Sequence, residues 1–261
     1  MDTNLLQQIL DRANSKFETS IQMNSTSSII TVNFPNKLNL KPELSYKVGV
    51  TLFSVFNLPK IVNENNNQLR YSKDNGVTWK TVSLSPGAYQ YSDLNPEIQT
   101  KLTANSDWTT DAIVIGVDLP SGKFTVKLLA NYQIDFNIPN SIRTILGFDA
   151  RIISTVGINL GDKIGNIEGG ISTINIKSDL SNGGYIADDN NNLIQRGILF
   201  TIPFLSVGMG SKIIEAPTNP IYYSVNQTSI SSINLSVVDE NNRIIDFGGQ
   251  TITIILHLKQ V

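Results

Sequence analysis

The residues Asp246-Phe247-Gly248 form the sequence DFG, with which protein kinases hold Mg²⁺. A kinase also needs a glycine-rich loop, a strand lysine and an HRD catalytic loop, and none of these motifs occurs elsewhere in the chain. We therefore expect no phosphoryl transfer at this position. The pattern instead predicts that Phe247 enters the core and that Gly248-Gly249 allows a turn or bulge before a final strand.

The chain offers few other side chains for catalysis or metal binding. It has no cysteine and one histidine, His257, so thiol nucleophiles and Cys- or His-rich metal sites are excluded. His257 shares the wetter face of an alternating strand with Thr253 and Lys259. No two of the 22 acidic residues stand out as a glycosidase pair. We predict no enzyme activity, no metal site and no cofactor.

Several short motifs have a structural explanation that outweighs the chemical one. Asp188–Asn192 and Asp239–Asn242 resemble parts of a calcium loop but lack its spaced ligands and terminal Glu, so turns are predicted. The glycine-rich stretch 155–170 lacks the Lys-Ser/Thr ending of a phosphate-binding loop and is predicted to be a long loop. Trp79 and Trp108 leave two interpretations open, a sugar-binding surface or core and interface packing, and packing is favoured.

Composition narrows the class of protein further. The chain has 261 residues, enough for one large β domain or two small ones, and a formal net charge of −2. It has no basic surface to attract nucleic acid, so direct specific binding to nucleic acid is not expected. Charged residues make up only 16% of the chain, against about a quarter in typical domains. This low share predicts a surface that other subunits partly cover.

No targeting or spanning segment is evident. The sequence contains no run of about 18 apolar residues, so no transmembrane segment is predicted. The N-terminal residues lack a basic n-region followed by a long apolar stretch, and we do not expect a signal peptide.

The periodicity predicts many strands and only a few short helices. Asn-Gly at positions 75–76 predicts a hairpin, and Asn95 followed by Pro96 predicts the N-cap and first position of a helix that ends near Leu102. A second short helix is predicted over 140–146. This pattern favours a sandwich, jelly roll or barrel over a parallel α/β fold. The strands are predicted over 28–34, 46–56, 68–72, 77–82, 87–91, 112–117, 123–129, 132–137, 171–177, 195–203, 221–225, 229–238, 243–247 and 251–259.

The first 26 residues are set apart by their pattern. Leu5, Leu6, Ile9 and Leu10 recur at helical spacing, and Asn24–Ser28 has the composition of a flexible hinge. A helix packed on its own domain is one interpretation. We favour an arm, partly helical, that docks on a partner, because a short isolated helix is marginal in water and its apolar stripe needs a surface. The predicted division is therefore an arm over 1–26 and a single domain over 27–261.

The last predicted strand alternates between apolar and polar residues. Ile252, Ile254, Leu256 and Leu258 share one face. We expect this face to line the core of the sandwich.

A series of motifs occurs in a fixed order along the chain. LGFDARI occupies Leu146–Ile152, a strand that leads to an SDL…NG turn lies within Ile174–Pro203, and Gly210–Val261 contains EAPTNPIYYSV and then NNRIIDFGGQTITIILHLK. Phe53–Ser72 and Gly87–Leu102 carry further matching stretches. In order and spacing these motifs resemble the minor capsid, or penton, protein of Polinton-type elements, adintoviruses and virophages. The resemblance covers roughly residues 45–261.

The resemblance implies an all-β fold, a single jelly-roll β-sandwich whose eight-stranded core carries inserted hairpins and short helices. It implies a structural virion protein of a DNA virus, assembled inside the host cell. In that family five copies form a ring at the fivefold vertex of an icosahedral capsid and contact the double jelly-roll major capsid protein. No catalytic residue is carried over from the family. A jelly-roll attachment module that binds a receptor or glycan remains the alternative, and a receptor or spike is a further expected partner.

Overall fold

The computed structural model describes residues 17–165, 171–183, 185–187, 193–195, 197–204, 208 and 210–261. The chain divides into two compact units. Unit 1 comprises Met1–Asn57 and Ser172–Val261, and unit 2 is the intervening segment Leu58–Ile171. Unit 2 is thus inserted between the two parts of unit 1.

Unit 1 is built from β-strands. Its strands are β1 (Glu18–Ser25), β2 (Ile29–Asn39), β3 (Tyr46–Phe56), β11 (Thr173–Ser178), β14 (Ile198–Pro203), β15 (Lys212–Glu215), β16 (Tyr223–Ser224), β17 (Ser229–Val238) and β18 (Ile252–Gln260), and β12 (Tyr185–Ala187) pairs with β13 (Leu193–Gln195) as a two-stranded sheet.

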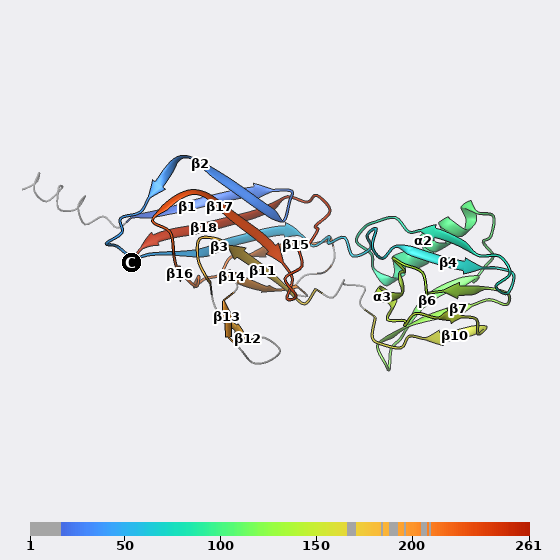
Figure 1. Ribbon diagram of the computed structural model, residues 1–261. Coiled ribbons are helices and arrows are strands. Elements are labelled where there is room, and N and C mark those ends of the chain that lie inside the picture. The colour runs from blue at the N-terminus through green and yellow to red at the C-terminus, as the bar shows by residue number, and fades with distance from the viewer. Residues whose placement is uncertain are drawn as a thin grey trace, which may run out of the picture. The chain divides into compact units, whose positions relative to one another are not determined.

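The larger strands of unit 1 form two antiparallel sheets (Figure 1). One sheet has the order β1-β18-β3-β15, with β16 also paired to β3, and the other has the order β14-β11-β17-β2. Successive strands of unit 1 change sheet at every connection between these two sheets except those from β11 to β14 and from β15 to β16. Two four-stranded paths linked in this way form a jelly roll, which confirms the predicted fold class.

The core of unit 1 is centred on β18, which lies between β1 and β3. Ile252, Ile254, Leu256 and Leu258 are fully buried there. Their intervening neighbours are partly exposed, as the alternating pattern requires of a strand with one face on the core. Apolar side chains of the second sheet complete this core, among them Ile176, Ile233 and Val237.

The first described strand lies where the sequence pattern indicated an arm and a hinge. β1 pairs with β18 over its whole length, from Glu18 opposite Lys259 to Ser25 opposite Ile252, and buries Met23. The predicted hinge over 24–28 is therefore two strand residues and a turn between the sheets, fixed where the Ser28 hydroxyl donates to the Ile245 carbonyl. Pairing with a strand more than 200 residues away stabilises this segment. The local composition does not predict this pairing.

Unit 2 has two smaller antiparallel sheets and two helices. The sheet orders are β10-β7-β6 and β5-β4-β8-β9. The elements are β4 (Gln68–Ser72), β5 (Lys80–Ser83), α2 (Tyr91–Ala104), β6 (Ile113–Asp118), β7 (Lys123–Leu128), β8 (Gln133–Asp135), α3 (Arg143–Leu146), β9 (Ile152–Ile153) and β10 (Gly157–Leu160).

The turn between β4 and β5 follows the sequence prediction. Asn75 and Gly76 both have positive φ, 56° and 86°. Asn and Gly tolerate this conformation best, which is why the dipeptide predicts a hairpin.

The start of α2 differs from the prediction. The helix begins at Tyr91, and the Asp93 carboxylate accepts a hydrogen bond from the backbone N–H of Gln90 (2.8 Å). Asn95, the predicted N-cap, instead uses its side-chain amide on the outer edge of β6. It accepts from the N–H of Ile115 (2.7 Å) and donates to the carbonyl of the same residue (2.9 Å). One side chain thus occupies the position that a neighbouring strand would fill.

We expect Asn95→Ala to lower the free energy of unfolding of unit 2 by about 1–3 kcal/mol, because both backbone groups of Ile115 lose their partner. Denaturant unfolding followed by tryptophan fluorescence measures this change, since both tryptophans lie in unit 2. Gln99→Ala, at an exposed position of the same helix, is the control and is expected to change little. Equal effects of the two substitutions would contradict the role assigned to Asn95.

Candidate functional site

The apolar residues of the predicted arm, Leu5, Leu6, Ile9 and Leu10, lie outside the described residues. The described chain begins at Phe17, which is anchored at the end of the sheet where β18 finishes and β3 begins. Its backbone carbonyl accepts from the N–H of Gln260 (2.8 Å), and its ring lies edge-on to that of Tyr46, with the centroids 5.9 Å apart. Phe17 is therefore held at a fixed point next to Tyr46.

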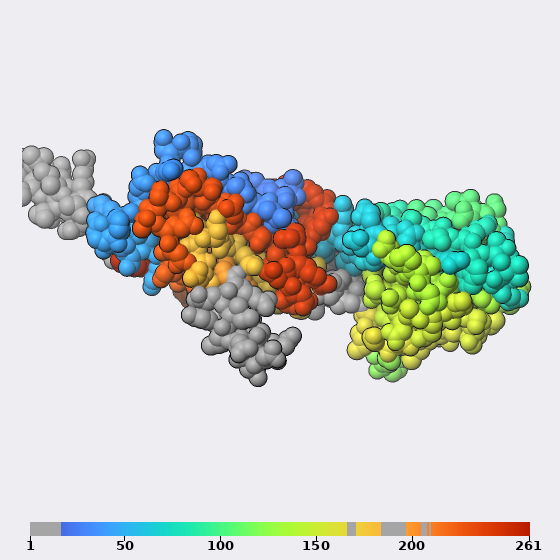
Figure 2. Space-filling model, viewed as in Figure 1, coloured from blue at the N-terminus to red at the C-terminus, as the bar shows by residue number. Residues whose placement is uncertain are grey.

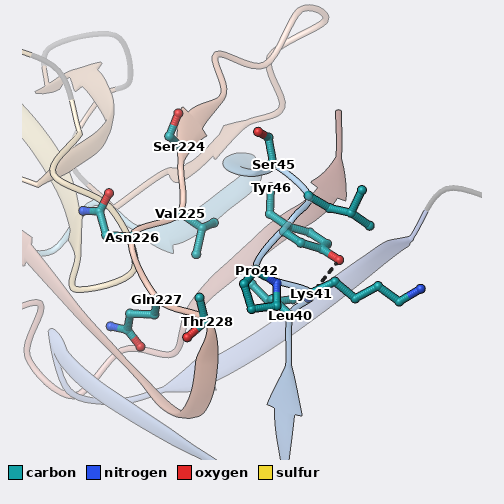
Figure 3. Close-up of a pocket in the computed structure, with 11 residues that line it drawn as sticks. Leu40, Lys41, Pro42, Ser45, Tyr46, Ser224, Val225, Asn226, Gln227 and Thr228 are labelled. Atoms are coloured by element: carbon teal, nitrogen blue, oxygen red, sulfur yellow. Dashed lines mark hydrogen bonds between the residues drawn. The ribbon is translucent and has the colours of Figure 1, made fainter.

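A pocket of about 210 Å³ opens in unit 1 beside Tyr46 (Figure 3). Its walls come from residues 40–46, which link β2 to β3, and from residues 224–228, which link β16 to β17. The Tyr46 hydroxyl accepts from the backbone N–H of Lys41 (3.3 Å). Lys41 and Tyr46 are the titratable residues of this lining, and neither is placed with a carboxylate.

A buried carboxylate organises a second cavity, of about 220 Å³, in unit 2. The Asp107 side chain is 1% exposed, and its carboxylate contacts two lysine ammonium groups and one tyrosine hydroxyl. Lys73 Nζ lies 2.5 Å from Oδ1, Lys80 Nζ lies 2.6 Å from Oδ2, and the Tyr71 hydroxyl donates to Oδ2 (2.8 Å). The Tyr132 hydroxyl donates to the Asp107 carbonyl (2.5 Å). The cluster ties the β4–β5 hairpin to the segment that follows α2.

The pKa values of this cluster follow from its geometry. Burial alone would raise the pKa of Asp107, but the hydrogen bonds from Lys73, Lys80 and Tyr71 outweigh burial and lower it to about 2. Burial raises the pKa of Tyr71 to about 12, and the neighbouring Asp107 carboxylate acts in the same direction. At neutral pH the carboxylate is therefore ionised and the phenol is protonated.

His257 lies in a contact between three segments of unit 1. Its Nε2 is 2.8 Å from the Glu18 carboxylate on β1, and its Nδ1 is 2.8 Å from the Tyr222 hydroxyl. The Lys259 ammonium lies over the Tyr222 ring, 3.7 Å from its centroid. The face that the pattern predicted to be wetter is therefore partly covered by residues just before β16.

The motifs near the C-terminus have the structural roles that their context predicts. Phe247 is buried, Gly248 and Gly249 both have positive φ, and the Asp246 carboxylate accepts from the N–H of Gly248 (2.8 Å). Asp239 caps the following turn, since its carboxylate accepts from the N–H groups of Asn241 and Arg243. The other acidic run, 188–192, lies outside the described residues.

The surface of both units carries large apolar side chains that face solvent. In unit 1 they include Ile29, Phe56, Ile214, Ile221 and Ile244, and in unit 2 they include Ile152, Val156, Ile158, Leu160 and Ile164. The five residues of the second group lie within one stretch of 13 residues, 152–164.

Across the described ranges, no group of three or more His, Cys, Asp or Glu side chains is placed to hold a metal ion. No helix in this part of the chain has the length and hydropathy needed to cross a membrane. The features found in this part of the chain are thus a pocket beside Tyr46, an ion-paired cluster around Asp107 and exposed apolar side chains.

Comparison with known proteins gives a likeness of fold to solved structures. No family model matches the sequence, and no curated protein matches it. Among solved structures, the chain is similar to a crystal structure of the selenomethionine-labelled mavirus penton protein. The TM-score is 0.48 and the identity 15%, and the match covers 95% of this chain and 100% of the other.

Proposed function

We propose that this chain is a structural virion protein, a penton subunit. In this proposal five copies form a ring at the fivefold vertices of an icosahedral capsid and contact a double jelly-roll major capsid protein. The observation that carries the proposal is a jelly-roll strand order in unit 1 together with penton-like motifs that continue through both units. LGFDARI, for example, runs from α3 to β9 in unit 2, and the last motif, 241–259, ends in β18 of unit 1.

The surface chemistry supports an assembly role. A closed ring of five uses a head-to-tail interface, so each subunit needs two different contact surfaces. Both units carry exposed apolar residues, and the chain has a low share of charged residues. These features favour a protein whose affinity is spread over several interfaces with neighbouring subunits.

The N-terminal arm is assigned to the contact with the rest of the capsid. Its apolar stripe, Leu5, Leu6, Ile9 and Leu10, needs a surface on which to pack. Phe17 fixes the root of the arm to the edge of unit 1 beside the pocket at Tyr46. Sixteen residues ahead of this anchor give the stripe the length to reach a neighbouring protein.

Leu6→Asp is expected to leave the folding of both units unchanged and to weaken docking to major capsid protein shells by about tenfold or more. A buried leucine contributes about 1.5–3 kcal/mol, and about 1.4 kcal/mol corresponds to a tenfold change. Co-sedimentation with shells measures docking, and circular dichroism checks the fold. Gln8→Asp, which adds the same charge on the polar side of the segment, is the matched control. A Leu6→Asp chain that fails to fold would show that the segment belongs to the core of its own domain.

The vertex position can be tested directly. Shells assembled from the major capsid protein encoded in the same genome are expected to show density at the fivefold positions only when this chain is present. Electron cryomicroscopy of both preparations makes the comparison. Density that appears elsewhere on the shell, or empty vertices in the presence of this chain, would overturn the proposal.

A second candidate function is attachment to a receptor or glycan, favoured by the cavity beside the β4–β5 hairpin. Tyr71, Lys73, Thr78, Lys80 and Asp107 supply it with hydroxyl, ammonium and carboxylate groups. The nearby Trp79 is less available, because the Arg70 guanidinium lies 5.4 Å from its ring centroid. A glycan array without hits above background would remove this candidate.

A further inference from the structure

β10 forms an outer edge of its sheet, and the hydrogen-bond pattern shows which of its backbone groups face outward. It pairs with β7 on one side only. The N–H of Gly161 donates to the carbonyl of Phe124 (2.8 Å), which makes this a hydrogen-bonded pair. In an antiparallel ladder such pairs alternate, so the next ones are Asn159–Val126 and Gly157–Leu128. The N–H and C=O groups of Ile158 and Leu160 therefore point away from β7.

The side chains of these two residues are also exposed. Ile158 is 72% and Leu160 45% exposed, and both lie on the same face of the strand because they are two residues apart. Figure 2 shows this stretch, in yellow, at the surface of unit 2. From Thr155 to Gly161 the sequence has no charged residue and no proline. Lysine, proline and inward charges are the usual features that prevent edge strands from pairing with other chains.

The opposite edge of the same sheet makes a useful contrast. On β6 the side-chain amide of Asn95 hydrogen-bonds to both backbone groups of Ile115 (2.7 and 2.9 Å). At Ile115, that edge is therefore covered by a polar side chain of the chain itself. Among the described residues no side chain takes the corresponding place at Ile158 or Leu160. The β10 edge thus lacks the side-chain cover that Asn95 gives to β6.

We propose that the β10 edge is a docking surface for a second copy of this chain, with the two β10 strands antiparallel about a twofold axis at Asn159. The outward residues, Ile158 and Leu160, are placed symmetrically about Asn159. Antiparallel pairing on this axis therefore sets Ile158 of each copy opposite Leu160 of the other. The outward N–H and C=O groups of all four residues find partners, and the two apolar cross-strand pairs cover one another.

The self-complementary pattern favours a second copy over β5, an open edge strand in the other sheet of unit 2. On β5 the equivalent outward positions are Thr81 and Ser83, because the Leu84–Asn67 bond sets the phase of that ladder. Pairing β10 with β5 would place Ile158 and Leu160 against polar side chains. Pairing it with itself places apolar against apolar and brings no like charges together, since residues 155–161 are uncharged.

The contact goes beyond the proposed ring. A twofold contact uses the same patch on both partners, whereas the contacts of a closed ring of five are head-to-tail. The β10 pairing therefore links copies that belong to different rings, or free subunits. Between two rings several β10 contacts form at once, so avidity would make the association of the rings stronger than a single strand contact.

The test is the solution mass of the full chain over a concentration series, for the wild type and three variants. Ile158→Lys and Leu160→Lys each introduce two positive charges into the contact, one from each copy. We expect each substitution to raise the dissociation constant of the pairing by about tenfold or more. Leu119→Lys is the matched control, because Leu119 is 87% exposed in the β6–β7 turn of the same sheet. It is expected to pair like the wild type. Circular dichroism confirms that all variants fold.

The masses separate this inference from the proposed ring. If the ring and the β10 pairing both form, the mass of the wild type is expected to rise to that of ten chains, and the mass of Ile158→Lys to stay at that of five. If only the pairing holds, the wild type forms dimers, which Ile158→Lys returns to monomers. A wild type that has the same mass as Ile158→Lys at every concentration overturns the pairing, whether that mass is five chains or one.

Strand pairing can be separated from mere apolar contact through the backbone. Ile158→Pro removes an outward N–H and leaves the bonds to β7 in place, because proline is tolerated on an open edge. This substitution is expected to abolish the β10 pairing. Ile158→Thr retains the N–H and the β-branched side chain, and it is expected to weaken the pairing less. Hydrogen exchange at the backbone N–H of position 160 is expected to slow on pairing in the wild type. In Leu160→Lys the exchange of the same N–H is expected to stay fast. Equally fast exchange in both, under conditions where pairing is seen, would contradict the strand geometry.

Discussion

Replacing Asp107 with alanine is expected to destabilise unit 2 by about 3–5 kcal/mol, because it removes one side of a buried ion pair. The Tyr71 hydroxyl, on a fully buried ring, loses its acceptor, while Lys73 and Lys80 are partly exposed and can regain water. This difference places the expected loss toward the lower end of the range. Denaturant unfolding followed by the fluorescence of Trp79 and Trp108 reports on unit 2. Asp149→Ala, which breaks an exposed pair with Lys163, is the control and is expected to cost less than about 1 kcal/mol.

The contribution of the Asp107 carboxylate to the stability of unit 2 depends on pH. The pKa of Asp107 is about 2 in the folded chain, against an ordinary value of 3.8. A depressed pKa means that the contribution to stability is present above the ordinary value and is lost as the pH falls from about 4 toward 2. Wild-type unit 2 is therefore expected to lose stability over this range, and Asp107→Asn is expected to lose less. Identical slopes for the two proteins would contradict the assignment of this network.

Leu256→Ala is expected to destabilise unit 1 by about 2–5 kcal/mol, the usual range for a fully buried leucine whose removal leaves a cavity. The residue lies in β18 between two paired strands, where the neighbouring backbone has little freedom to collapse. Thermal unfolding by circular dichroism gives the change, and the tryptophan signal of unit 2 is expected to shift little. Ile255→Thr, on the half-exposed face of the same strand, is the control. Equal losses from both would mean that β18 does not present one face to the core.

Where the sequence anticipated the fold, the determining interactions were local. The alternation of Ile252, Ile254, Leu256 and Leu258 is visible without any partner strand, and the turn at Asn75-Gly76 follows from the φ values that these residues tolerate. The predicted jelly roll was reached through motif resemblance, and the strand order bears it out. Local pattern was therefore sufficient for strands and turns that carry their own signal.

The features that were missed depend on distant residues. β1 is stabilised by β18, and Asn95 is drawn from the helix cap to the β6 edge, 20 residues further along the chain. The Asp107 cluster brings together β4, β5 and the segment after α2, a combination that no spacing rule contains. The separation of residues 58–171 into their own unit likewise follows from which strands pair.

β10 was a different kind of omission. The sequence interpretation places 155–170 in a glycine-rich loop, yet Val156, Ile158 and Leu160 alternate with other residues over a short stretch. Gly157 inside the strand and Gly161 directly after it favour a loop over a strand. Apolar residues with a period of two, even around a glycine, are a signal that would have located this edge strand.

The central claim is that this chain assembles into a fivefold ring, and the measurement that tests it most directly is solution mass by light scattering with negative-stain images of the same peak. Measured on Leu160→Lys, so that pairing at β10 does not interfere, the mass is expected to be five times 28.7 kDa, with fivefold rings in the images. Rings of another symmetry would contradict the account. So would a chain that stays monomeric both alone and when co-expressed with the major capsid protein.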